Sequence, residues 1–64
     1  MWVEIKKVNN LMLAEMWQEF FEGEGIPTHI QPASGGAPGR ELTPYIVLVP
    51  EDKRHVIDEV LRKL

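Results

Sequence analysis

The chain has 64 residues, enough for a single domain over residues 1–64, and so small a core predicts modest stability or stability shared with a partner. It contains no cysteine, which excludes disulfides and cysteine-based zinc sites. A formal net charge of −3 argues against nucleic acid as a partner, and no apolar run approaches the roughly 18–20 residues of a membrane span. Met1 is not followed by a signal-peptide pattern, so we expect a cytoplasmic protein.

Residues 2–8 are predicted to form a strand, because apolar and polar side chains alternate along them. The alternation separates two sets of side chains, Val3 and Ile5 on one face and Trp2, Glu4 and Lys6 on the other. Asn9 and Asn10 then offer side-chain oxygens that can cap the free N–H groups of a helix. A helix over residues 11–24 is therefore expected next, and Gly25 is expected to end it.

This helix carries a wider apolar stripe than one sheet face requires. At about 100° per residue, the stripe consists of Leu13, Met16, Trp17, Phe20 and Phe21. Most of it is expected in the core, while Met12 and Met16 on one flank are expected to reach the surface. The acidic residues of the same helix are expected to form a solvated face.

Two further strands and a second helix are expected in the rest of the chain. Residues 26–31 alternate, and Pro27, which has no N–H to donate, marks them as an edge strand. Residues 32–44 contain three Gly and three Pro, which is typical of a loop. Residues 45–49 are apolar on both faces, as in a central strand. The helix expected over residues 51–63 would bury Val56, Ile57, Val60, Leu61 and Leu64.

The predicted order of elements is βαββα, which indicates an α+β protein with a ferredoxin-like fold. A right-handed crossover over the first helix leaves room for the third strand between the first two. We therefore expect a three-stranded mixed sheet of order 1-3-2, with the first and third strands parallel and both helices on one face. The outer edge of the first strand would then be free to accept a partner strand.

Four segments that cover nearly all of the chain carry a resemblance. They are Ala14-Glu15-Met16, Phe20-Phe21-Glu22, Glu24-Gly25-Ile26-Pro27 and Val47-Leu48-Val49-Pro50-Glu51-Asp52. Together they resemble a family of small prokaryotic signal-transducing proteins, a domain of unknown function. The resemblance implies a ferredoxin-like βαββα fold and a regulatory or binding role, and it implies no catalytic residues.

The expected loop contains a candidate anion site. Its residues are Ser34, Gly35, Gly36 and Arg40, which offer a hydroxyl, converging backbone N–H groups and a guanidinium. The segment is not a Walker A motif, because no Gly-Lys-Ser/Thr sequence follows the glycines. The plainer interpretation is a mobile hairpin loop.

No catalytic, metal or cofactor site is predicted. His29 and His55 lack the spacing of metal ligands, and we expect both at the surface. The chain shows no nucleophile–base pair and no carboxylate pair with a cleft, so we do not expect an enzyme.

Surplus apolar side chains point to an interface, since exposed apolar area usually marks one. The candidate interface residues are Trp2, Met12, Met16 and Tyr45. On the central strand, either Tyr45, Val47 and Val49 or Ile46 and Leu48 must face away from the helices. The surplus favours a homodimer. The alternative is a monomer in which Trp2 and the Lys6 stem cover the patch.

We therefore predict a small non-enzymatic regulatory or protein-interaction module in signal transduction, with a protein partner or a second copy of itself. The alternative is a sensor of a small anion or nucleotide that binds through residues 34–40. Neither a nucleic acid nor a membrane is expected as a partner.

Overall fold

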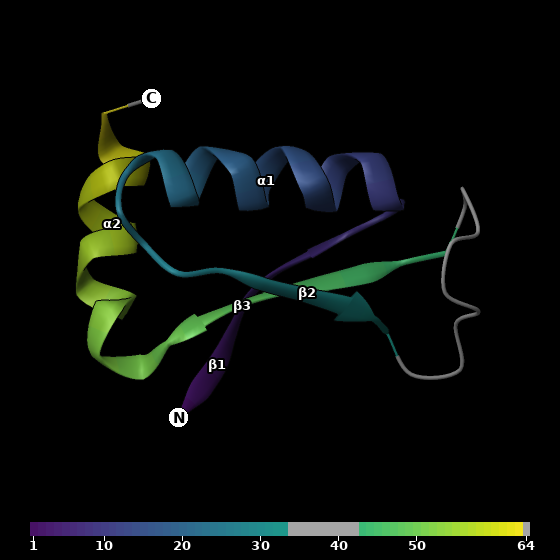
Figure 1. Cartoon of the computed structure of the whole chain (residues 1–64), viewed down its shortest axis with the longest axis horizontal. Coiled ribbons are helices and arrows are strands. Elements are labelled where there is room, and N and C mark those ends of the chain that lie inside the picture. Colours follow the sequence, from purple (N-terminus) through teal and green to yellow (C-terminus); the bar gives the residue numbers. More distant parts are fainter. Residues whose placement is uncertain (34–42, 64) are drawn as a thin grey trace.

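Two helices and a three-stranded sheet make up the computed structural model, which describes residues 1–33 and 43–63 (Figure 1). The elements are β1 (Trp2–Val8), α1 (Leu11–Gly23), β2 (His29–Pro32), β3 (Tyr45–Pro50), the short 3-10 helix η1 (Glu51–Lys53) and α2 (Arg54–Arg62). The predicted α+β class and the βαββα order are confirmed. β2 is shorter than predicted, because it begins at His29 rather than at Ile26.

The sheet has the predicted order, β1-β3-β2, but both of its strand pairs are antiparallel. The prediction of a mixed sheet, with parallel first and third strands, was therefore wrong. A crossover over α1 makes β1 and β2 run in the same direction, and β3 runs back against β2. β3 is consequently antiparallel to both of its neighbours.

A β-bulge between Glu4 and Lys6 shifts the register of β1 by one residue. Glu4 and Lys7 therefore lie on the same face of the sheet, although an odd number of positions separates them. Lys6 lies on the helix side, where its Nζ is 4.7 Å from the centroid of the Trp17 ring. The expectation that Trp2, Glu4 and Lys6 share one face was thus wrong for Lys6.

Local hydrogen bonds close both ends of α1. At its start, Asn10 Oδ1 accepts a hydrogen bond from the N–H of Leu13 at 2.9 Å, so the predicted cap is confirmed. At its end, Gly25 adopts a φ of 83°, and the N–H of Ile26 donates to the carbonyl of Phe21 at 3.0 Å. This is a Schellman turn, and it directs Ile26 into the core beside Phe21.

Both helices cover the same face of the sheet, and Figure 1 shows α1 along that face with α2 at one end of it. The main core cluster joins α1, β3 and α2 and consists of Phe21, Ile26, Val47, Val49, Ile57 and Val60. Val47 and Val49 point to one side of β3, since they are two residues apart on a strand. The opposite side of the sheet is covered by neither α1 nor α2.

Candidate functional site

The sheet face that neither helix covers collects side chains from all three strands, and we call it the open face. It consists of Trp2, Glu4 and Lys7 from β1, His29 and Gln31 from β2, and Ile46, Leu48 and Pro50 from β3. The central strand contributes only apolar side chains, whereas the two outer strands contribute charged and polar ones alongside Trp2. The open face is therefore an apolar stripe between two more polar margins.

The register of β3 decides which of its side chains face away from the helices. Tyr45, Val47 and Val49 are buried on the helix side, while Ile46 and Leu48 lie half-buried on the open face. Apolar surface left in water costs about 25 cal/mol per Å² relative to its burial. The part of this stripe that remains exposed therefore favours a covering partner.

Trp2 is the largest apolar side chain of the open face, and it is 49% exposed. It lies opposite Pro50 in the register. The centroid of its ring is 5.9 Å from that of His29, which belongs to the far outer strand. Because β3 lies between β1 and β2, the Trp2 ring must extend across the central strand. An exposed aromatic ring thus lies at the end of the open face where β3 finishes.

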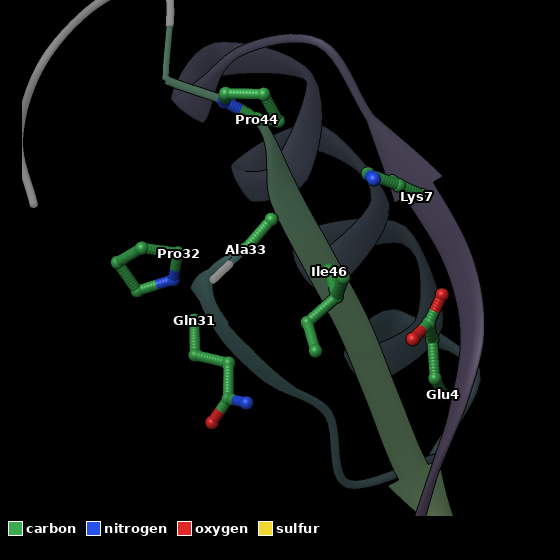
Figure 2. A pocket seen from close by; sticks show the side chains of 7 residues that line it. All are labelled: Glu4, Lys7, Gln31, Pro32, Ala33, Pro44 and Ile46. Carbon is green, nitrogen blue, oxygen red and sulfur yellow. The ribbon is translucent and has the colours of Figure 1, made fainter. Parts of the chain in front are cut away.

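A hollow of about 530 Å³ lies toward the other end of the open face. It is lined by Glu4, Lys7, Gln31, Pro32, Ala33, Pro44 and Ile46, which Figure 2 shows around β3. A hydrogen bond of 2.9 Å from the N–H of Ala33 to the carbonyl of Pro44 joins two of these residues. The end of the hollow away from Trp2 is apolar, the β1 side carries Glu4 and Lys7, and the β2 side carries the uncharged Gln31.

Glu4 and Lys7 place opposite charges on neighbouring positions of one margin. Glu4 lies opposite Leu48 and Lys7 opposite Ile46, so the two charges are about 7 Å apart along the strand direction. Both side chains are exposed, and neither is in an ion pair with another described residue. Both charges are therefore available to a partner.

The four residues predicted as an interface do not form one surface. Trp2 belongs to the open face, whereas Met12 and Met16 are 73% and 51% exposed on α1, across the sheet from it. Tyr45 is buried beneath α1, in a second core cluster with Ala14. Met12 and Met16 lie one helical turn apart and form a small patch of their own.

The predicted anion site, Ser34, Gly35, Gly36 and Arg40, lies outside the described residues. Of the two histidines, His29 lies on the open face and His55 in α2, and both are exposed. Within residues 1–33 and 43–63, no three His, Asp or Glu side chains are grouped so that they could hold a metal ion.

Sequence reasoning missed Lys7, Gln31 and the hollow. One signal for Lys7 was present: Val3, Ile5 and Val8 are all apolar, yet a regular strand cannot direct all three to one face. This break in the alternation indicates the bulge that moves Lys7 onto the open face. The hollow gave no comparable signal, because it depends on the register of β2 against β3.

Comparison with known proteins adds no relative, since the sequence matches no protein-family model, no curated protein and no solved structure. In the part of the chain that the structure describes, no helix has the length and apolar character needed to cross a membrane. The open face is therefore the feature from which a function can be inferred.

Proposed function

We propose that this chain is a small, non-enzymatic regulatory module that binds a protein partner through its open face and acts in signal transduction. The observation that carries the proposal is the half-exposed Trp2 at the end of an apolar stripe that neither helix covers. Large aromatic side chains of this kind are the usual anchors of protein interfaces.

The distribution of charge on the open face supports a protein as the ligand. Ile46 and Leu48 offer apolar contact in the middle, while Glu4 and Lys7 offer one charge of each sign at a margin. An apolar centre with a polar margin is the common anatomy of a protein interface. Charges of both signs favour a partner of mixed charge over a uniformly charged polymer.

The proposal includes a ferredoxin-like assignment for the fold and the cytoplasm as its location. Two features support the assignment: the sheet order β1-β3-β2 and the position of both helices on one side. In such a two-layer arrangement the second sheet face is free to bind, which agrees with the regulatory or binding role that the family resemblance implies.

Photo-crosslinking in the cells that produce the protein tests this proposal. Leu48 on the open face, or Glu19 on the exposed side of α1 as a control, is replaced by photoreactive p-benzoylphenylalanine. We expect irradiation to join position 48, but not position 19, to a polypeptide that mass spectrometry identifies and that also binds the purified chain. No product at position 48, or equal products at both positions, would contradict the proposal.

A further inference from the structure

We propose that the partner of the open face is a second copy of this chain, bound face to face about a two-fold axis, with each Trp2 in the other copy's hollow. This inference rests on the proposed function, because it names the partner of the same face. A two-fold interface must be self-complementary, so each feature of the face has to meet its own counterpart on the same face.

The features of the open face follow one another in four rows along the strands. In order, the rows are Trp2 with Pro50, Glu4 with Leu48 and His29, Lys7 with Ile46 and Gln31, and Pro44 with Ala33. Successive rows are two residues apart on β3, which corresponds to about 7 Å. The exposed ring therefore lies in the first row, and the apolar end of the hollow lies in the last.

A two-fold axis that crosses the strands between the second and third rows exchanges the rows in pairs. It places Glu4 of each copy opposite Lys7 of the other, so that one charge pattern yields two ion pairs. At the centre it places Leu48 opposite Ile46, which buries apolar surface against apolar surface. The bulge in β1 is essential, because it brings Lys7 rather than Lys6 to this face.

The same axis places the first row over the fourth, and so brings Trp2 over the hollow of the second copy. A tryptophan buries about 150–250 Å² of surface when it is covered. The hollow, at about 530 Å³, has room for the ring, and Ala33 and Pro44 give it apolar walls. An aromatic ring seated in a pocket is the feature that most often dominates the energy of an interface.

Another two-fold axis, parallel to β3, would also join the open faces but in a different register. It would place Glu4 opposite His29 of the second copy and Lys7 opposite Gln31. In that arrangement no carboxylate meets a lysine, and Trp2 does not reach the hollow. We favour the axis across the strands, because it both pairs Glu4 with Lys7 and places Trp2 over the hollow.

The interface should be weak. Three short strands present a face of about 300 Å² in projection, below the roughly 800 Å² that each partner buries in a standard interface. We therefore expect a Kd in the micromolar range. Sedimentation equilibrium of the purified chain, from micromolar to near-millimolar concentration at low salt, measures it directly.

Charge reversal at Glu4 and Lys7 tests the register in which the two copies pair. Glu4→Lys, or Lys7→Glu, replaces two attractions by two repulsions, and we expect either to raise the Kd about tenfold. The double variant Glu4→Lys with Lys7→Glu restores opposite charges across the axis, so we expect the Kd to return near that of the parent. Glu19→Lys, a charge reversal of the same size on α1, should leave the Kd unchanged.

A separate experiment tests whether Trp2 binds in the hollow of the other copy. We expect Trp2→Ala to raise the Kd about 30-fold, as for a principal anchor. In a mixture of isotope-labelled and unlabelled chains, isotope-filtered NMR should show contacts between the Trp2 ring of one copy and the Ala33 methyl group of the other. Circular dichroism of each variant verifies that the chain remains folded.

The inference is overturned if the parent chain remains monomeric throughout this range, or if the double variant fails to recover association. It is also overturned if the Trp2 ring shows no intermolecular contact with Ala33. These results leave the proposed function standing if photo-crosslinking at position 48 identifies a different protein. Failure of the proposed function itself would appear as the absence of any cross-linked polypeptide at position 48.

Discussion

Gly23 and Gly25 lie two positions apart at the end of α1, yet their backbones impose opposite requirements. Gly25 has a φ of 83°, which disfavours any side chain, whereas Gly23 is helical, and neither has an atom within 4 Å of an added Cβ. We expect Gly25→Ala to lower the free energy of unfolding by about 1 kcal/mol, and Gly23→Ala to raise it by about 0.5–1 kcal/mol. Urea unfolding measures both, and equal effects of one sign would refute this account of the turn.

Val47 and Leu48 test which side of β3 faces the helices. Val47 is fully buried, so we expect Val47→Ala to cost about 2 kcal/mol from lost transfer free energy and the cavity left behind. Leu48 is larger but half-buried on the open face, so Leu48→Ala should cost only about 1 kcal/mol or less. Urea unfolding at low protein concentration makes the comparison. A larger loss for Leu48→Ala would mean that the two faces have been assigned the wrong way round.

The bulge of β1 makes a testable difference between two adjacent lysines. Lys6 holds its ammonium 4.7 Å from the centre of the Trp17 ring, a cation–π contact, while Lys7 lies on the open face. A double-mutant cycle of Lys6→Met and Trp17→Leu should give a coupling energy of about 0.5–1 kcal/mol. The matched cycle of Lys7→Met and Trp17→Leu should give none. Coupling in the second cycle alone would place Lys7, not Lys6, on the helix side.

Features with a local cause were predicted from the sequence, as was the order of the strands, whereas the direction of the strands was not. The cap at Asn10 and the stop at Gly25 depend on a few neighbouring residues, and both were predicted. The apolar run of β3 likewise marked it as the central strand. The direction of a strand depends on the combined effect of all preceding connections. The prediction that the first and third strands run parallel was wrong.

The open face was predictable only in part for the same reason. The surplus of apolar residues predicted an uncovered surface, and Trp2 was correctly placed on the face away from the helices. Tyr45 was assigned to an interface because either set of β3 side chains could have faced outward. Only the pairing of β3 with both neighbours, including the bulge, assigns Tyr45 to the core and Ile46 to the open face.

At the scale of the whole molecule, the described elements form two layers, and neither helix covers the open face of the sheet. Figure 1 shows α1 along one side of the sheet with α2 at its end, which corresponds to one sheet and one layer of helices. A chain of this length has a total stability of only about 3–10 kcal/mol. Burial of the open face against a second copy would therefore form a substantial part of the stability of the folded state.

The thermal midpoint should consequently depend on protein concentration. A partner that binds only the folded chain stabilises it by about 2.7 kcal/mol when its concentration is 100 times the Kd, which raises the Tm by on the order of 10 °C in a domain of this size. We expect the parent chain to show this rise in calorimetry across a concentration series. Glu4→Lys, which weakens the pairing about tenfold without touching the core, should need about ten times the protein concentration to reach the same rise in Tm. A parent Tm independent of concentration would mean that the folded chain gains nothing from a second copy.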